Sequence, residues 1–301
     1  MSKDLVPSSY PDAVPATIDV DQLPPETAAA AITRSEIDIQ VSTARRYPRS
    51  LKKFRDMAVQ MATIDEDTAA SCFYMLPRGE KTIEGPSVRL AEIVAVSWTN
   101  LRHGGRIIEE NDRFIVAQGM AHDMEANVMS SVEVRRRITD SKGRRYSDDM
   151  IAVTAQAAIA IATRNAIFKV VPRAFVDQIY AVARRAAKGE EKTLGVRRQA
   201  ALDYFAKEQG VTKDKVFARL STPEKKVAGI EDIGLAELEM LQGLRQAIKD
   251  GETNAHEAFS PQPDAGAETK KVDQFVAAEK AKDAVAKTVE AEFEPAAKKE
   301  K

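Results

Sequence analysis

A dense group of basic side chains between Ser131 and Tyr146 is the part of this sequence best suited to chemistry. Six Lys or Arg residues stand there against two acids, Glu133 and Asp140. The six are Arg135, Arg136, Arg137, Lys142, Arg144 and Arg145. Each phosphate that such a group neutralises releases condensed counterions, so the cluster predicts salt-sensitive, sequence-independent binding of a polynucleotide backbone. The alternative interpretation is a solvated hairpin that binds nothing.

Further basic residues extend this candidate surface. The stretch 42–55 holds no acid, and on a helix its Lys52 and Arg55 share one face. Arg164 and Lys169 fall on the polar side of a later alanine-rich helix. We add these four residues to the candidate DNA-binding set, although a surface helix with its apolar side turned inward would show the same pattern.

The side chains that usually carry catalysis or hold a metal are scattered along this chain. His103, His122 and His256 lie in unrelated contexts, without the Cys/His/carboxylate spacing of a zinc site. Asp148 and Asp149 are adjacent, so on a helix they point about 100° apart and resemble a helix cap more than a metal pair. No glycine-rich phosphate loop ending in Lys-Ser/Thr occurs. We therefore predict no catalytic residues, no metal and no cofactor.

The amino-acid composition limits which classes of protein and which cellular compartments remain possible. The net charge is -1, so any positive field must be local. The single cysteine, Cys72, excludes an internal disulfide framework, suits a reducing cytoplasm and lies in an apolar context typical of a buried thiol. The N-terminus lacks the pattern of a signal peptide, and Thr154 and Gln156 interrupt the longest apolar helix pattern. We expect a cytoplasmic protein without a membrane span.

Three strands must carry the basic cluster. Strand-like alternation covers 102–110, 114–121 and 128–138, with a bend expected at His103-Gly104-Gly105. A tight turn follows at 140–143, where glycine allows a positive φ.

Helices must support these strands. The pattern predicts an amphipathic helix from about Ser50 to Met61 and a core-facing helix after Pro86-Ser87. A long helix is predicted over 150–169, capped by Ser147 and stopped by Pro172. Its alanines at three- and four-residue spacing would let it lie close against a sheet.

The predicted fold class is α+β: a twisted antiparallel sheet backed by a long helix, followed by a small all-α module, with disordered termini. Residues 1–35 form a proline-containing arm, and 36–188 form the DNA-binding core. Residues 196–253 form the helical module, and 254–301 form a tail rich in Ala, Lys and Glu. Sixty residues is near the lower limit for an independent core.

The order of these elements resembles the single-strand DNA annealing proteins of phages, of the RecT and Redβ type. Their superfamily also includes the eukaryotic ring-forming strand-annealing recombination protein. The resemblance covers about residues 80–175 and rests on a few segments. These are Ile83-Glu84-Gly85 with Leu90-Ala91, the strands 106–110, 114–121 and 128–138, the hairpin 140–146, and Ala158…Ala162-x-Arg164-Asn165-Ala166-Ile167. The unit 201–251 is similar to C-terminal modules of phage recombination proteins.

The resemblance implies a protein that binds single-stranded DNA and anneals complementary strands without ATP, in phage-type homologous recombination. It implies homo-oligomeric rings or filaments, with the strand in a cationic groove between the hairpin and the long helix. The C-terminal region would recruit a host single-strand binding protein. The net charge of -1 and the arginine-rich hairpin depart from the family pattern.

Two other functions fit the same residues. An oligomeric phage structural or adaptor protein would use the sheet for assembly and would not bind DNA at physiological salt. A metal-dependent nuclease would need a carboxylate site that the sequence does not display.

Overall fold

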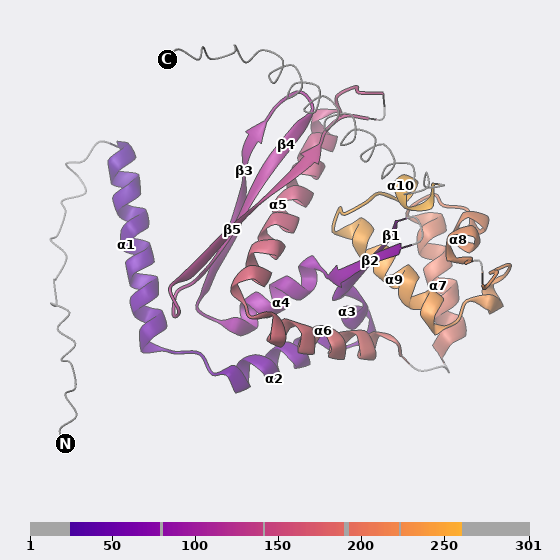
Figure 1. Cartoon of the computed structure of the whole chain (residues 1–301), viewed down its shortest axis with the longest axis horizontal. Helices are drawn as coiled ribbons and strands as arrows, with labels where there is room; N and C mark the ends of the chain where they lie inside the picture. Colours follow the sequence, from indigo (N-terminus) through magenta and orange to yellow (C-terminus); the bar gives the residue numbers. More distant parts are fainter. Residues whose placement is uncertain (1–24, 79–80, 141, 190–192, 223, 261–301) are drawn as a thin grey trace, which may run out of the picture.

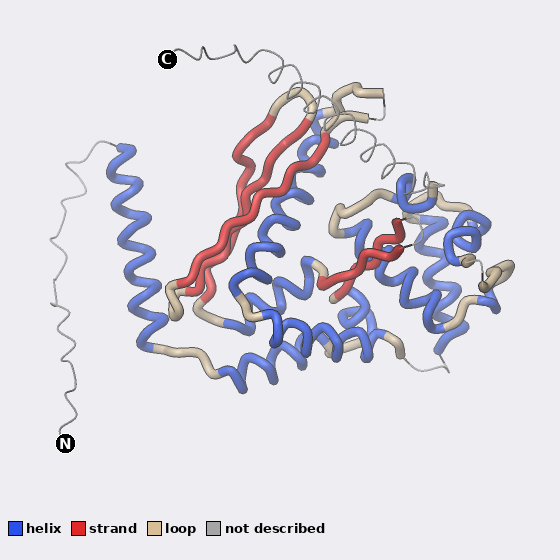
Figure 2. Tube along the Cα trace, viewed as in Figure 1, coloured by secondary structure: helices blue, strands red, loops and turns tan. Residues whose placement is uncertain are grey.

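A three-stranded antiparallel sheet backed by one long helix forms the centre of the molecule (Figure 1). The computed structural model describes residues 25–78, 81–140, 142–189, 193–222 and 224–260. Strands β3 (Leu101–Glu110), β4 (Phe114–Asp123) and β5 (Val128–Arg137) pair in the order β3-β4-β5. Helix α5 (Asp148–Val170) runs along one face of this sheet, as Figure 2 also shows. The predicted α+β class, with a sheet on a long helix, is confirmed.

Small residues allow the sheet and α5 to approach closely. Ala158 and Ala162 of α5 are fully buried. A Cβ placed on Gly119 of β4 would overlap the backbone of Ala162, and one placed on Gly105 of β3 would lie 2.7 Å from the Thr163 hydroxyl. The alanine spacing in the sequence therefore predicted this contact correctly, because any larger side chain would separate the two layers.

Local signals at the ends of these elements also agree with the sequence. The Ser147 hydroxyl accepts a hydrogen bond from the backbone N–H of Met150 and so caps α5. The irregularity in β3 lies between Ile107 and Glu109, whereas we expected a bend at His103-Gly104-Gly105. Gly105 instead provides space for α5, which explains why a glycine stands in that strand.

The chain before the sheet forms four helices and a β-hairpin among the described residues. These elements are α1 (Pro25–Arg46), α2 (Leu51–Ala62), α3 (Glu66–Ser71), β1 (Phe73–Arg78), β2 (Lys81–Pro86) and α4 (Val88–Trp98). Helix α1 starts inside the segment that we predicted as an arm, and the rest of that segment lies outside the described residues. The β1–β2 hairpin, paired antiparallel, was not predicted.

Below the sheet, α2, α4 and α6 (Arg173–Ala187) share a core (Figure 1). Phe54, Trp98 and Phe175 pack as a triangle of rings, with centroids of the first two 4.8 Å apart. Edge-to-face contacts of this kind favour one arrangement of the three helices.

The helical region after residue 193 packs against the rest of the chain. It contains α7 (Leu194–Lys207), α8 (Lys213–Leu220), the 3₁₀ turn η3 (Ile230–Asp232), α9 (Leu235–Lys249) and α10 (Ala255–Phe259). Its own core includes Phe205 and Phe259, the latter in a segment that we assigned to the tail. The remaining predicted tail, 261–301, lies outside the described residues. Helix α9 lies on β1, where a Cβ on Gly243 would be 2.7 Å from that of Met75.

Helix α5 is long and apolar enough to cross a membrane by length and composition alone, with a mean hydropathy of 1.4 over its most apolar window. Ile151, Ala158 and Ile161 of this helix are buried within the fold. The apolar character of α5 therefore serves its contact with the sheet.

Candidate nucleic-acid interface

The sheet face that turns away from α5 carries arginines from both edge strands. Ile115 and Ala117 of β4 pack with Ala158 of α5, so the alternate residues of β4 and their cross-strand neighbours face the other way. The arginines on this open face are Arg102, Arg106, Arg135 and Arg137, and the acids are Glu109 and Glu133. We call this surface the open face. Its net positive charge is local, as the chain's overall charge requires.

Contacts within the open face hold some of these guanidinium groups in place. The Arg135 guanidinium lies over the Phe114 ring, 3.4 Å from its centroid. Arg106 Nη2 of β3 donates to Oε1 of its cross-strand neighbour Gln118 at 3.4 Å. Arg135 and Arg137 have no carboxylate ion-pair partner among the residues that the structure describes, and both are exposed. Their charges are therefore available to an external anion.

The turn after β5 places more basic side chains at the end of the sheet. Asp140 Oδ1 accepts from the backbone N–H groups of Lys142 and Arg144, at 2.8 and 2.9 Å, and Gly143 has a φ of +80°. These bonds, the one from the backbone of Arg144 foremost, lower the pKa of the Asp140 carboxyl. Arg144 Nε also bonds Asp140 Oδ2 at 2.8 Å.

Two of the basic residues of this turn are thus partly neutralised. Arg145 Nη2 pairs with Glu110 Oε1 at 2.5 Å, and its Nη1 donates to the carbonyl of Asn111. Arg144 keeps 75% of its side chain exposed, and Lys142 is exposed as well. Exposed ion pairs of this kind contribute little to stability and can exchange a carboxylate for a phosphate.

Two predicted DNA-binding residues are engaged inside the fold. Arg136 faces α5, and its guanidinium donates to the carbonyls of Gly251 and Glu252. Arg164 is buried and donates to the carboxylate of Glu252 and the amide oxygen of Asn165. Residues 251–252 therefore occupy the guanidinium groups of both arginines.

The remaining predicted residues lie away from the turn. Lys52 and Arg55 are exposed on α2, at the end of the sheet opposite the turn (Figure 1). Arg55 Nη2 lies 3.5 Å from Asp56 Oδ1. Lys169 is exposed in the last turn of α5. The structure thus brings Arg135, Arg137 and the turn residues together but separates Lys52 and Arg55 from them.

Arg49, in the same basic stretch as Lys52, has a structural role that the sequence did not reveal. Its guanidinium binds both carboxylate oxygens of Asp123, donates to Glu125 and lies 4.3 Å from the centre of the Trp98 ring. Trp98 Nε1 also donates to Asp123 Oδ2, at 2.9 Å. Arg49 and Asp123 are 74 residues apart in the chain, so no local pattern could have paired them.

Sequence reasoning also missed two arginines of the open face. Arg102 and Arg106 are isolated cations in β3, and they join the surface only because β3 is the far edge of the sheet. Arg102 Nη1 reaches Gln40 Oε1 of α1 at 3.3 Å. Beside this contact, a cleft of about 440 Å³ lies between α1 and the start of β3, lined by Ile39, Thr43 and His103 among others. The strand alternation could have placed both arginines on the correct face.

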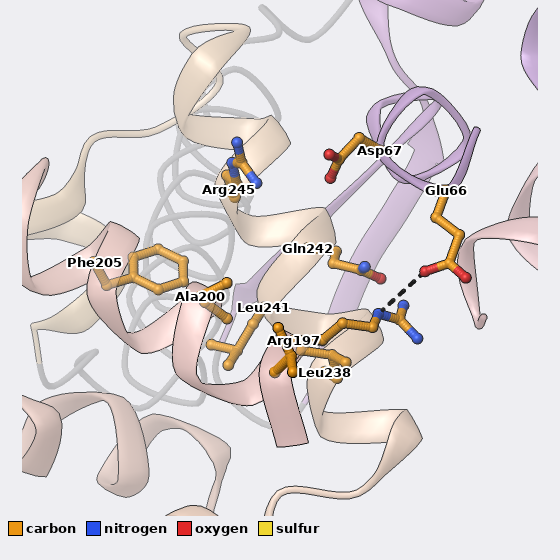
Figure 3. Close-up of a pocket in the computed structure, with 11 residues that line it drawn as sticks. Glu66, Asp67, Arg197, Ala200, Phe205, Leu238, Leu241, Gln242 and Arg245 are labelled. Atoms are coloured by element: carbon orange, nitrogen blue, oxygen red, sulfur yellow. Dashed lines mark ion pairs between the residues drawn. The ribbon is translucent and has the colours of Figure 1, made fainter. Parts of the chain in front are cut away.

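A cavity of about 250 Å³ separates α3 from α7 and α9 (Figure 3). Arg197 crosses it toward Glu66, with Nε 3.6 Å from Oε2, while its other nitrogens donate to the carbonyls of Ala187 and Lys188. These bonds tie the start of α7 to the end of α6. We interpret the cavity as a packing gap between α3 and the helices α7 and α9.

The described residues contain no cluster of three or more His, Cys, Asp or Glu side chains that could hold a metal ion. Cys72 is fully buried, as we predicted, and burial raises its pKa to about 12. A thiol with such a pKa is protonated at neutral pH and is a poor nucleophile.

Comparisons with protein families, with curated proteins and with solved structures found no match to this chain. The resemblance to strand-annealing proteins therefore stays a prediction.

Proposed function

We propose that this protein binds single-stranded DNA through the open face and the adjoining turn, and that it anneals complementary strands without ATP. The observation that supports this best is the set of arginines on a sheet whose other face packs against α5. Arg135 and Arg137 lie two residues apart on one edge strand and Arg106 lies on the other, so all three can offer a guanidinium group to phosphates on this face. The guanidinium fork suits phosphate geometry.

Annealing follows if the protein holds the backbone and leaves the bases exposed. Phosphate contacts fix the position of the strand and carry no sequence information, so Watson–Crick pairing alone selects the complement. Neutralising the phosphates also lowers the repulsion between two approaching strands. Neither step needs a nucleotide cofactor or a catalytic side chain.

The proposal includes assembly of several copies along one strand, in a ring or a filament. Each strand of the sheet has ten residues, which is about 33 Å at the usual rise. A nucleotide strand in a duplex advances about 3.4 Å per residue, so one copy spans about ten nucleotides. Both edges, β3 and β5, are unpaired on their outer sides within the described part of the chain. A role in phage-type recombination in a host cytoplasm, with a host single-strand binding protein as partner, belongs to the same proposal.

The unpaired edges equally suit an oligomeric structural or adaptor protein, which is our second candidate. Such a protein would show no salt-dependent affinity for single-stranded DNA. A nuclease, the third candidate, would shorten labelled DNA in the presence of Mg²⁺.

Strand annealing can be measured directly. Two complementary oligonucleotides, one with a fluorophore and one with a quencher, are mixed at low ionic strength with and without the full-length protein, and without ATP. We expect the protein to accelerate quenching of the complementary pair and to leave a non-complementary pair unaffected. An unchanged annealing rate over a range of protein concentrations would refute the proposal.

A further inference from the structure

The turn at the end of α9 lies against two arginines of the DNA-binding core. The carbonyls of Gly251 and Glu252 accept from Arg136 of β5, and the Glu252 carboxylate accepts from Arg164 of α5. Only 7% of the Arg164 side chain and 16% of the Glu252 side chain are exposed. Arg164 also lies over the Tyr74 ring, 5.1 Å from its centroid. Two cations from two elements thus converge on one acidic turn.

The turn is seated by specific contacts. Asp250 Oδ2 accepts from the backbone N–H of Val88 at 3.0 Å, and its Oδ1 accepts from Gln246 at 2.7 Å. Gly251 has a φ of +73°, and a Cβ on it would overlap that of Ala157 in α5. Only glycine fits this position without strain.

The chemistry of this contact is that of an anion site. A guanidinium binds a carboxylate and a phosphate with the same planar pair of N–H donors. Arg136 meets neutral carbonyl oxygens at this turn, so its charge lacks a carboxylate counterpart there. It also stands between Arg135 and Arg137, at the edge where the open face ends. Its side chain points to the α5 side of β5, so it can reach a strand on the open face only around the outer edge of β5.

We infer that the turn 250–252 is an internal competitor that occupies a phosphate-binding site of Arg136 and Arg164. When the turn withdraws, the two guanidinium groups form a second phosphate-binding site on the α5 side of β5, around its outer edge from the open face. This inference depends on the proposed function, because the ligand is the backbone of the single-stranded DNA. The helical module then regulates DNA affinity through one acidic turn.

The test compares three full-length variants by their affinity for a fluorescent oligothymidylate. Glu252→Gln removes the competing charge, and Gly251→Val displaces the turn by steric overlap. Glu257→Gln is the matched control, because Glu257 lies in α10 of the same module and has no ion pair among the described residues. We expect the first two variants to bind roughly tenfold more tightly than wild type, with a log–log salt slope steeper by up to about 1.4, since each contact to a single strand adds about 0.7.

A fourth variant assigns the gain to the proposed site. Adding Arg164→Gln to Glu252→Gln should remove most of the increase, because the exposed cation is then absent. If wild type binds DNA and neither Glu252→Gln nor Gly251→Val binds more tightly, the turn is not a competitor although the proposed function stands. An equal gain in Glu257→Gln would also overturn the inference, since it would show a general charge effect. Absence of binding in every variant would overturn both the inference and the proposed function.

Discussion

The double substitution Arg135→Gln, Arg137→Gln should weaken single-stranded DNA binding and flatten its salt dependence. Both side chains are exposed on the open face, and Arg135 contacts the Phe114 ring. Neither takes part in an ion pair with a carboxylate in the described structure. Glutamine keeps much of each side chain's length and hydrogen-bonding ability while it removes the charge. Arg136 stays unchanged, because its bonds to the 251–252 turn would mix a folding effect with a binding effect.

The magnitude follows from the number of contacts. Each phosphate contact on a single strand contributes about 0.7 to the slope of log K against log salt, so the loss of two contacts flattens the slope by about 1.4. Between about 50 and about 200 mM salt, wild type should therefore lose about sevenfold more affinity than the variant does. The open face has four arginines, so roughly half of its contribution should remain.

Fluorescence anisotropy of a labelled oligothymidylate, titrated at four salt concentrations, gives the slope. Arg89→Gln with Arg173→Gln is the matched control, because it removes the same charge from two exposed arginines of α4 and α6. We expect the control to keep the wild-type slope within error. An equal slope for wild type and for Arg135→Gln, Arg137→Gln would show that DNA does not contact this face.

Two further predictions concern the fold. Gly119→Ala should lower the free energy of unfolding, measured in urea, by about 1–3 kcal/mol, because the new Cβ overlaps the backbone of Ala162. The control is Gly195→Ala, in an open position of α7, which should be neutral or stabilising by up to about 1 kcal/mol. Equal changes in the two variants would refute the close approach of β4 to α5. Burial raises the pKa of Cys72 from 9.0 to about 12, so stability should fall as pH rises above about 9, where only the unfolded thiol ionises. Iodoacetamide should therefore modify Cys72 at pH 8 only after denaturant is added, and rapid modification of the native protein would contradict this.

The sheet and its supporting helix were predictable because their signals are local. Alternation defined β5, and the Ser147 cap and Pro172 bounded α5 within about two residues. The alanine spacing in α5 predicted a close contact, which Gly119 completes from the sheet side. Each of these signals depends on a few neighbouring residues, so it predicts the same strand or helix whatever distant segment packs against its apolar face.

The partners of individual arginines were not predictable, because they are set by contacts between distant segments. Arg136 and Arg164 meet the 251–252 turn across separations of 115 and 88 residues. Both belong to the basic pattern that predicted DNA binding. Strand alternation puts Arg136 on the apolar side with Val134 and Ile138, but no local pattern identifies the distant turn as the partner of either arginine. The β1–β2 hairpin was missed for a related reason, since its first strand packs against α9, which is far away in the sequence.

The packing of α5 decides which surface can bind DNA. A strand cannot enter between the sheet and α5, because Gly119 and Ala162 are already in backbone contact there. If the proposed function holds, phosphates lie on the open face, or along the β5 edge once the 250–252 turn has moved. The open face is always accessible, whereas the site at the β5 edge is accessible only after the turn has moved. DNA binding at the two sites should therefore differ in salt slope and in its response to Glu252→Gln. If DNA binding depended only on Arg164 and not on Arg135 or Arg137, the site at the β5 edge would be the main one, and the open face would then be left for contacts between copies.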